Sequence, residues 1–415
     1  MKEMEDSIDK GCKMEHDFTD RQTDRQTDRQ TDRQTDRQTI SAIIVALSAD
    51  GLKQLAESLD YQKVDVCGVV VQNVQGVKVR LCGRDIPVYA FSALRALMQK
   101  YGNNIYYLLC GVVTHTRDLG AMASMMLKIH PTISKAHILN ANIGFSDSWL
   151  GNLHYAETED IKFFATGISY TEFGVDIRQF PYRGVNLGYA SQDLFNGYRT
   201  AKHVFAHHDD TIRFVLIGLC PYIFHYDLEE SFSVRGQRYQ YDFIFQPEDE
   251  RLDHVIMKES VRRIYWSEYA SHPDPNNDRV RYIQDFRLFG GCGILDFKRE
   301  LEDVGVHYRA DVLKKNKEIL ANYIQLCRTH HAVPIGVVFP FSVCLQEAYP
   351  ERDLAEFRSI LDDYRNMAGF EVIDLFDERW DESCFQNLSH VNVKGAAVAS
   401  TMIAKKVEEI LQKGQ

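Results

Sequence analysis

One serine and one histidine of this chain have the residue types that nucleophilic catalysis needs. Ser169 lies in the stretch Gly167-Ile-Ser-Tyr-Thr-Glu-Phe-Gly174, directly after an apolar run, and His390 ends the stretch Asn387-Leu-Ser-His. A serine hydroxyl is a weak nucleophile unless an imidazole accepts its proton, and the imidazole works best when a third group fixes its tautomer. Asn387 can orient the ring but adds no negative charge. The pattern predicts acyl-group chemistry, with Ser169, His390 and Asn387 as the catalytic set.

Alternating strands and helices must position this set. Residues 161–166 predict a buried strand that runs straight into Gly167-Ile-Ser169, and residues 214–218 predict a second strand. The C-terminal part predicts a helix over 310–327, a strand over 334–340, a helix over 353–368, a strand over 370–375 and a last helix over 395–411. Such alternation favours a parallel sheet in an α/β domain. Ser169 is then expected on a strand-to-helix turn, and His390 just before the last helix.

This order of motifs resembles the SGNH, or GDSL-type, hydrolase superfamily over roughly residues 160–410. Gly167-Ile-Ser169 is similar to the first block of that family, Gly-Asp-Ser, with Ile168 in place of the aspartate. Asn186-Leu-Gly188 is similar to the second block, whose glycine gives a backbone N–H to an oxyanion hole. The resemblance implies a flavodoxin-like, three-layer α/β/α domain over 158–415. It also implies that Ser169 is the nucleophile, and that Gly188 and the Ser169 amide hold the oxyanion beside Asn186.

Two positions depart from the family pattern. The strand over 214–218 continues into Leu-Cys220, where the family has an oxyanion-hole asparagine, and Asn387 stands where the family has an aspartate. Losing one oxyanion donor costs about a hundredfold or more in rate. The departures predict a slower esterase, a Ser–His dyad, or a domain that has lost its activity and binds its ligand. Asp374 and Asp377, just before the histidine motif, are alternative third residues.

A polar block over 229–305 has no counterpart in a minimal domain of this family and is predicted to be an insertion. Four aromatic or imidazole side chains stand at its entrance: Tyr222, Phe224, His225 and Tyr226. Insertions after sheet strands commonly form specificity surfaces. We expect these four side chains on the active-site side, where Tyr222 and His225 would bind a sugar ring by stacking.

Residues 19–38 are five identical copies of Thr-Asp-Arg-Gln. The tetranucleotide ACAG, read in triplets, translates as this repeat, so we infer a repeat tract in the gene. Gain or loss of one unit shifts the reading frame, which predicts phase-variable expression, typical of genes that modify surface glycans or govern host contact. This inference suggests an acylated sugar or glycan precursor as the substrate, with acetyl as the expected acyl group. The alternative is an expendable solvated tail, and in both cases residues 1–39 are predicted to be disordered.

Residues 40–150 predict a separate Rossmann-like domain. Strands are predicted over 40–47, 64–71, 105–110 and 136–139, and helices over 50–59, 92–100 and 116–129. Its first turn, Ala46-Leu-Ser-Ala-Asp-Gly51, carries only one of the glycines that let a backbone approach pyrophosphate. No dinucleotide or other cofactor is therefore predicted.

Composition bounds the class of protein. The chain has 415 residues, 45% hydrophobic and 26% charged, with a formal net charge of −11. No dense basic run is present, so nucleic acid is not predicted as a partner. No apolar run of about 18 residues and no signal-peptide core are present, which predicts a cytoplasmic protein without a membrane span. The nine cysteines form no CxxC pair and are predicted to be reduced thiols.

Other constellations have simpler interpretations. His207-His-Asp-Asp210 is interpreted as a solvated helix end rather than a metal site, and His330-His331 as another helix end. Gly290-Gly-Cys-Gly293 is interpreted as a loop. No metal is therefore predicted. Ser169 with Glu172 also has the spacing of a helix capping box, the alternative to a catalytic role.

Overall fold

The computed structural model describes residues 39–72, 78–111, 147–208, 210–228, 273–279, 308–368 and 370–413, with residues 122, 125–133, 138–140, 231, 241, 245 and 306 between them. The tail with the Thr-Asp-Arg-Gln repeats and the stretch 290–293 lie outside these residues. The chain divides into two compact units: residues 1–144 with 232–264, and residues 145–231 with 265–415. Both units are α/β, as predicted from the sequence.

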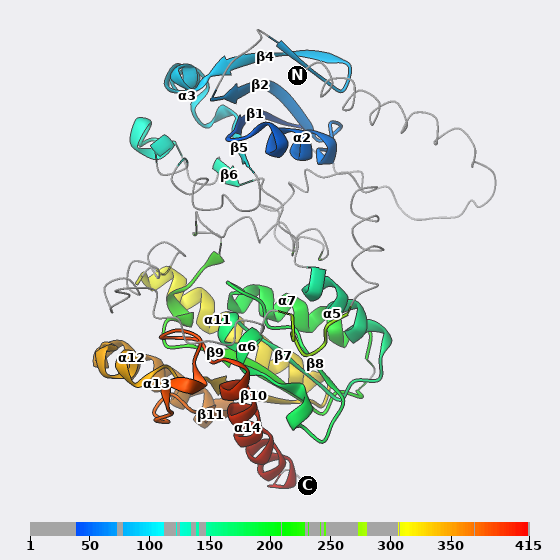
Figure 1. Ribbon diagram of the computed structural model, residues 1–415, viewed down its shortest axis with the longest axis vertical. Helices are drawn as coiled ribbons and strands as arrows, with labels where there is room; N and C mark the ends of the chain where they lie inside the picture. Colours follow the sequence, from blue (N-terminus) through cyan, green and yellow to red (C-terminus); the bar gives the residue numbers. More distant parts are fainter. Residues whose placement is uncertain are drawn as a thin grey trace, which may run out of the picture. The chain divides into compact units, whose positions relative to one another are not determined.

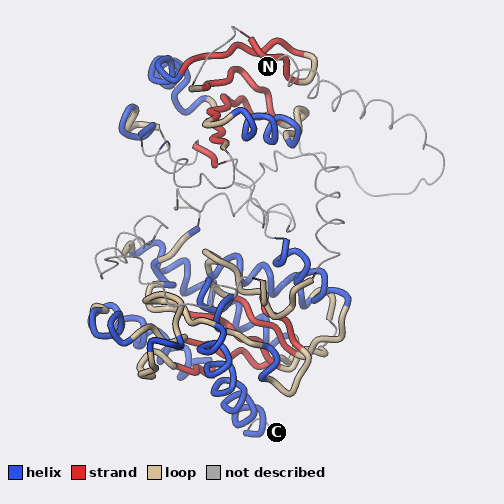
Figure 2. The backbone as a smooth tube through the Cα atoms, in the orientation of Figure 1, coloured by secondary structure: helices blue, strands red, loops and turns tan. Residues whose placement is uncertain are grey.

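The first unit is built on a six-stranded sheet in the order β3-β4-β2-β1-β5-β6 (Figures 1 and 2). Its strands are β1 (Ile40–Ala46), β2 (Val64–Val71), β3 (Lys78–Leu81), β4 (Arg84–Ala90), β5 (Tyr106–Cys110) and β6 (Ile138–Asn140). All pairs are parallel except the β3–β4 hairpin, which the sequence pattern did not predict. Helices α2 (Ala49–Ser58) and α3 (Leu94–Tyr101) accompany the sheet. Apolar side chains such as Val45, Val70 and Tyr107 form its core, because parallel strands are buried on both faces.

Gly51 lies in the first turn of α2, after β1, where another chain segment comes close to it. Ser48 caps α2 by accepting a hydrogen bond from the Gly51 amide at 3.0 Å. A Cβ at position 51 would lie 2.6 Å from the backbone of Gly111, just after β5. Gly51 is therefore needed for the close approach of two chain segments inside this unit.

The second unit has a five-stranded sheet in the order β11-β10-β9-β7-β8, and every pair is parallel. The strands are β7 (Phe163–Thr166), β8 (Gly184–Asn186), β9 (Phe214–Leu219), β10 (Val333–Val338) and β11 (Glu371–Asp374). The helices are α5 (Asp147–Thr158), α6 (Ser169–Gly174), α7 (Leu194–Phe205), α11 (Ala310–Thr329), α12 (Val343–Ala348), α13 (Glu351–Ala368) and α14 (Val393–Lys413). Helices α5, α7 and α11 pack together on one side of the sheet, and α14 packs with α6 on the other (Figure 1).

Helix α5 corrects the predicted domain boundaries. The sequence pattern ended the first domain at 150 and began the second at 158, which splits this helix. Trp149 on α5 is 1% exposed, and its indole N–H donates to the Leu187 carbonyl at 3.2 Å. Asn152 donates to the Asn186 carbonyl. The helix therefore belongs to the second unit, which begins at Phe145.

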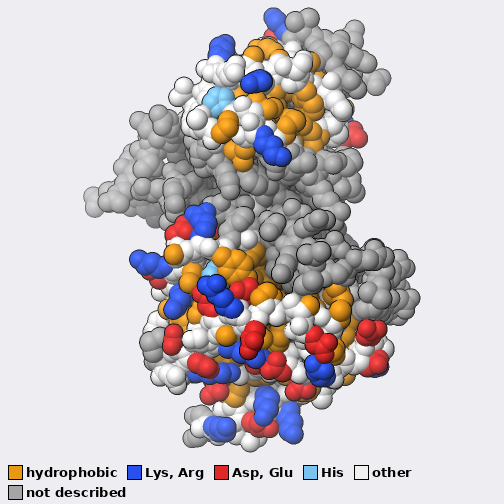
Figure 3. Space-filling model, turned by 90° about the vertical axis from the view of Figure 1, so that its left-hand side faces the viewer, with side chains coloured by type: hydrophobic (Ala, Val, Ile, Leu, Met, Phe, Trp, Pro, Cys, Tyr) orange, Lys and Arg blue, Asp and Glu red, His pale blue; other side chains and the backbone are white. Residues whose placement is uncertain are grey.

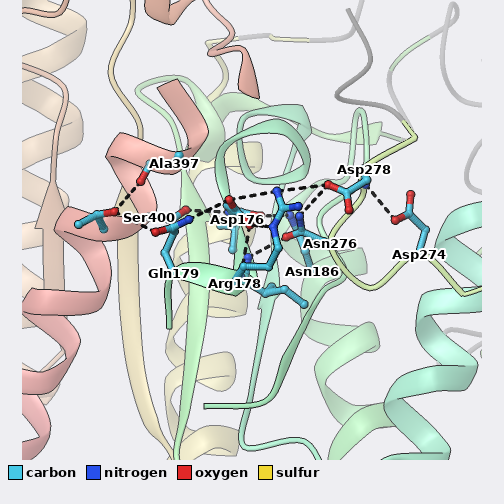
Figure 4. A network of polar contacts seen from close by, with 12 residues as sticks. Asp176, Arg178, Gln179, Asn186, Asp274, Asn276, Asp278, Ala397 and Ser400 are labelled. Carbon is cyan, nitrogen blue, oxygen red and sulfur yellow. Dashed lines mark hydrogen bonds and ion pairs between the residues drawn. The ribbon is translucent and has the colours of Figure 1, made fainter. Parts of the chain in front are cut away.

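Most of the predicted insertion over 229–305 lies outside the described residues, but residues 273–279 lie against the edge strand β8. The Pro275 carbonyl accepts the Asn186 amide at 2.8 Å, and Asn277 Oδ1 accepts from Asn152 at 2.8 Å. Figure 4 shows the polar network around this segment. In it, Asn276 Oδ1 accepts the Ile177 amide at 2.8 Å. This segment therefore covers the free edge of β8 with hydrogen bonds.

The network continues across the unit to the last helix. Arg178 forms an ion pair with Asp176 at 2.8 Å and with Asp278 at 3.5 Å (Figure 4). Ser400 of α14 accepts the Asp176 amide at 2.7 Å and donates to the Gly174 carbonyl at 3.1 Å. The C-terminal end of α6 is thereby joined to α14, so elements far apart in the sequence hold each other in place.

The described surface has no continuous basic track on the face in Figure 3. There, acidic and basic side chains of the second unit are interspersed rather than gathered by sign. Among the described residues, no helix has the length and apolar character that crossing a membrane requires. Six described cysteines carry free thiols: Cys67, Cys110, Cys220, Cys327, Cys344 and Cys384.

Candidate active site

The turn between β7 and α6 positions Ser169. Strand β7 ends at Thr166, and α6 begins at Ser169. Gly167 between them has φ +142°, a conformation that side-chain-bearing residues rarely adopt. Ile168, not Ser169, is the N-cap, and it makes no side-chain capping bond. The capping-box interpretation of Ser169 and Glu172 is therefore wrong, and the Ser169 hydroxyl is available for another partner.

That partner is His390, which lies in the loop before α14. Phe385 and Val391 form an isolated antiparallel bridge across this loop. The His390 carbonyl accepts the Gln386 amide at 2.9 Å. Ser169 Oγ lies 2.7 Å from His390 Nε2, so the fold brings the serine and the histidine of the sequence pattern into hydrogen-bond contact.

Asn387 sets the tautomer of this histidine. Its Oδ1 accepts the backbone N–H groups of Ser389 at 3.0 Å and His390 at 2.8 Å. His390 Nδ1 lies 3.1 Å from the same oxygen, so assignment from this hydrogen-bond network makes Nδ1 the protonated ring nitrogen. Nε2 then carries the lone pair that faces Ser169. Asn387 thus orients the ring as the third residue of a triad does, but without a charge.

The surroundings of the ring favour its neutral form. Tyr170 and Phe173 lie against His390, with ring centroids at 4.9 and 5.3 Å. Burial lowers the pKa of His390 from the usual 6.5 to about 4. The cation is disfavoured because desolvation penalises charge. At neutral pH the imidazole is therefore unprotonated at Nε2, as a general base requires.

The two aspartates proposed as alternative third residues have another partner. Arg358 of α13 lies 3.0 Å from Asp374 and 2.8 Å from Asp377. Neither carboxylate contacts His390 among the contacts of the described residues, whereas Asn387 does. This ion-pair group attaches α13 to the end of β11 and leaves the orienting role to Asn387.

The second sequence block has a different local role from the one its resemblance implies. Asn186 is fully buried, and its Nδ2 donates to the carbonyls of Thr171, Glu172 and Val175 at 2.9, 3.2 and 3.1 Å. Its Oδ1 accepts the Gly188 amide at 2.9 Å. Asn186 therefore caps the end of α6, and the Gly188 amide is already bonded within the protein. The glycine is needed for packing, because a Cβ there would lie 2.7 Å from the Glu172 nitrogen.

Burial contradicts the stacking surface expected at the entrance of the insertion. The side chains of Tyr222, Phe224, His225 and Tyr226 are 3%, 1%, 6% and 0% exposed. Cys220, directly after β9, is also buried, which raises the pKa of its thiol. These residues form core rather than a sugar-binding face. His225 Nε2 lies 3.2 Å from Glu356, at the rim of this core.

Tyr222 nevertheless contacts the surroundings of His390 indirectly. Its hydroxyl donates to the Tyr170 hydroxyl at 3.0 Å, and the ring of Tyr170 packs against His390. Sequence reasoning missed Tyr170, Phe173 and Ser389. All three adjoin the motif residues, and Ser389 Oγ lies 3.1 Å from His390 Nδ1. The signal that could have found them was their position beside Ser169 and His390, since aromatic side chains next to an imidazole exclude water from it.

Comparison with known proteins adds no assignment to this geometry. No protein-family model matches the chain. A search of curated proteins finds no match either. The candidate site therefore stands on its own contacts.

Proposed function

We propose that the second unit is a serine esterase or acyltransferase of the SGNH type. The single observation that supports this most directly is the 2.7 Å contact between Ser169 Oγ and His390 Nε2. Three further features of the site agree with it: the position of Ser169 on a strand-to-helix turn, the tautomer set by Asn387, and the lowered pKa of His390. A Ser–His pair with an orienting third group is the arrangement that activates a serine hydroxyl.

In the proposed reaction, Ser169 Oγ attacks the carbonyl carbon of an acyl ester while His390 Nε2 accepts the hydroxyl proton. The tetrahedral intermediate collapses as His390 returns that proton to the leaving alcohol oxygen, which leaves an acyl group on Ser169. Water, in an esterase, or a second hydroxyl, in a transferase, then attacks the acyl group by the reverse sequence. The backbone N–H of Ser169, in the first turn of α6, is the oxyanion donor that the proposal retains. The Gly188 amide would serve only after release from Asn186.

The proposed substrate is an acylated sugar or surface-glycan precursor, with acetyl as the proposed acyl group. The support is indirect. The Thr-Asp-Arg-Gln repeats point to phase-variable expression, which is typical of genes that modify surface glycans. The all-parallel sheet with helices on both sides agrees with the flavodoxin-like, three-layer architecture that the SGNH resemblance implies. We also propose a cytoplasmic location, because the sequence has no apolar run of about 18 residues.

A second candidate function is an inactive SGNH-like protein that binds or assembles glycans. Three observations favour it: the bonded Gly188 amide, Cys220 in place of an oxyanion asparagine, and the uncharged Asn387. A domain with these changes would keep the fold and a ligand while losing turnover.

Hydrolysis of p-nitrophenyl acetate by the full chain distinguishes the two functions. We expect activity that falls to the buffer rate in Ser169→Ala and in His390→Ala. The matched control is Ser359→Ala, an exposed serine on α13, which should keep full activity. Equal rates in all four proteins would contradict an esterase.

Covalent labelling covers the case of a transferase that needs its own acceptor. A fluorophosphonate probe phosphonylates an activated serine and does not depend on an acceptor. We expect labelling at Ser169 that disappears in His390→Ala and persists in Ser359→Ala. Absence of both labelling and hydrolysis would leave the binding protein as the better account.

A further inference from the structure

Three side chains at the ends of helices α5 and α7 form a cluster that the sequence interpretation overlooked. Glu157 of α5, His203 of α7 and His207, in the turn just after α7, each present one ligand-type atom, and these atoms all lie within 4.8 Å of one another. This turn brings the imidazole of His207 next to that of His203. The sequence interpretation had grouped His207 with His208 and Asp210 as a solvated helix end. Instead, His208 is buried and bonded to the Ala156 carbonyl.

The contacts within the cluster already orient its atoms. His203 Nε2 lies 2.6 Å from Glu157 Oε1, and the imidazole rings of His203 and His207 are 4.7 Å apart. His207 Nδ1 lies 2.8 Å from the His203 carbonyl, which can only accept, so Nδ1 carries the proton and Nε2 keeps its lone pair. Metal-binding histidines are commonly fixed in this way by a carbonyl on the other ring nitrogen. On the other side, His154 Nδ1 lies 3.2 Å from Glu157 Oε2.

The charge and exposure of the cluster suit a cation. Glu157 is 13% exposed and His203 22%, while His207 is exposed. The carboxylate is therefore partly shielded from water and reachable from solvent on the His207 side. Two imidazoles and one carboxylate are a ligand set that zinc accepts, with water in the fourth position.

The cluster is distant in the fold from the Ser169 turn. Ser169 follows the carboxyl end of β7, whereas Glu157 precedes β7 and His207 precedes β9. In a parallel sheet, these helix ends lie at the amino edge of the strands, opposite the carboxyl edge. The cluster therefore takes no part in the proposed acyl chemistry, and a ligand there would act on the packing of α5 against α7.

We propose that Glu157, His203 and His207 bind one divalent transition-metal ion, with zinc as the best match, and that the ion links α5 to α7. On binding, the ion takes the place of the proton between His203 Nε2 and Glu157 Oε1; that proton passes through solvent to Nδ1 of the same ring, so the imidazole stays neutral. Because α5 is the element that begins the second unit, the link strengthens the attachment of this helix. The inference does not depend on the proposed esterase activity.

The test uses the full chain, freed of metal with a chelator and dialysed. Isothermal titration with ZnCl2 is expected to give one equivalent of zinc bound per chain. At a zinc concentration a hundredfold above Kd, Tm of the second unit should rise by about 5–10 °C. MgCl2 at the same concentration should leave Tm unchanged, because magnesium prefers oxygen ligands.

Paired variants separate this site from general surface binding. His203→Gln and Glu157→Gln should each weaken zinc binding at least tenfold and thereby reduce the rise in Tm to about half or less. The matched control, Glu159→Gln, removes an equal charge near the same helix end but only an exposed pair with Arg183, and should respond like the parent chain. Circular dichroism without zinc checks that all variants fold. Absence of zinc binding by the parent chain, or binding that persists unchanged in both cluster variants, would overturn the proposal.

Discussion

Asn387 holds the His390 ring by accepting hydrogen bonds rather than by supplying charge. Three donors converge on its Oδ1: two backbone N–H groups and the ring nitrogen Nδ1. A carboxylate oxygen would accept the same three bonds and would also stabilise the imidazolium that forms when Ser169 loses its proton. With an amide, burial acts without opposition, and the pKa of His390 falls to about 4. The site is therefore organised for a base that remains neutral over most of the pH range.

This arrangement makes a prediction about pH. The folded pKa of about 4 lies below the usual 6.5, so the neutral, active form of His390 persists as pH falls to about 4. We expect kcat/KM for p-nitrophenyl acetate to stay level from pH 8 down to about 5, and to fall only near pH 4. In Asn387→Asp, the carboxylate should raise the pKa of His390, so the acidic limb should move to higher pH.

The control for this prediction is Asn387→Ala, which removes the orienting oxygen without adding charge and should lower the rate at every pH. An acidic limb near pH 6.5 in the unmodified chain would contradict the burial of the histidine. An unchanged limb in Asn387→Asp would contradict the contact between residue 387 and Nδ1.

At the scale of elements, the packing of helix α6 against β9 determines the position of Ser169. The Thr171 side chain lies directly over Gly218 of β9, where a built Cβ would overlap its Oγ1. The same hydroxyl oxygen lies against Gly167. Thr171 is two residues from Ser169 on the same helix. Because Gly218 has no side chain, α6 packs close enough to β9 for Ser169 to contact His390.

We therefore expect Gly218→Ala to lower the free energy of unfolding of the second unit by about 1–3 kcal/mol, as overpacking does. Its rate of p-nitrophenyl acetate hydrolysis should fall by more than this loss of stability explains. Gly197→Ala is the matched control, because a Cβ there comes no closer than 3.5 Å to another atom, Thr166 Oγ1, which is an ordinary contact. In the interior of α7, that change should stabilise by about 0.5–1 kcal/mol. Urea unfolding and p-nitrophenyl acetate hydrolysis measure both effects; equal behaviour of the two variants would refute the seating argument.

Elements with a strong apolar pattern could be predicted from the sequence. Strands β1, β9 and β10 are buried apolar runs, and the expected ranges differ from the observed ones by one or two residues. Strand β8 is only three residues long, Gly-Val-Asn, too short to show a period. Helix α5 was missed because its inner face includes Asn152, whose partner Asn277 is 125 residues away. From the sequence alone, such a polar residue argues against a buried helix face, because its distant hydrogen-bond partner cannot be recognised.

The candidate site shows the same division. The pairing of Ser169 with His390 could be predicted, because each lies in a recognisable motif. The role of Asn186 could not, because its four hydrogen bonds depend on where the end of α6 lies in space. The burial of Tyr222 and His225 could not be predicted from the sequence either, because aromatic residues beside a polar block occur both in cores and on surfaces.

At the scale of the molecule, the second unit has its own sheet, core and candidate site, and its first element is α5. This makes a prediction about truncation. A chain that begins at residue 145 should fold and keep the Ser169-dependent hydrolysis of the full chain within a few-fold. A chain that begins at residue 159 should fail to fold, because it lacks Trp149, Leu150 and Leu153, each at most 1% exposed. Each such side chain contributes about 1.5–3 kcal/mol against a total of about 5–15.

Soluble yield and a cooperative thermal transition measure this outcome. If both fragments behave alike, the boundary drawn at α5 is wrong. The division into two α/β units could be predicted from the alternation of strands and helices.

The separation of Ser169 and His390 along the chain determines how long after the serine the histidine is synthesised. They are 221 residues apart, and His390 lies in the last loop before the terminal helix. At a synthesis rate of about 5–20 residues per second, roughly 10–45 s pass between the appearance of the hydroxyl and that of its imidazole partner. During that interval the growing chain carries Ser169 without its histidine partner. The contact forms only after residue 390 has been synthesised, so a chain cut short between the two residues contains the serine without the imidazole that the proposed reaction requires.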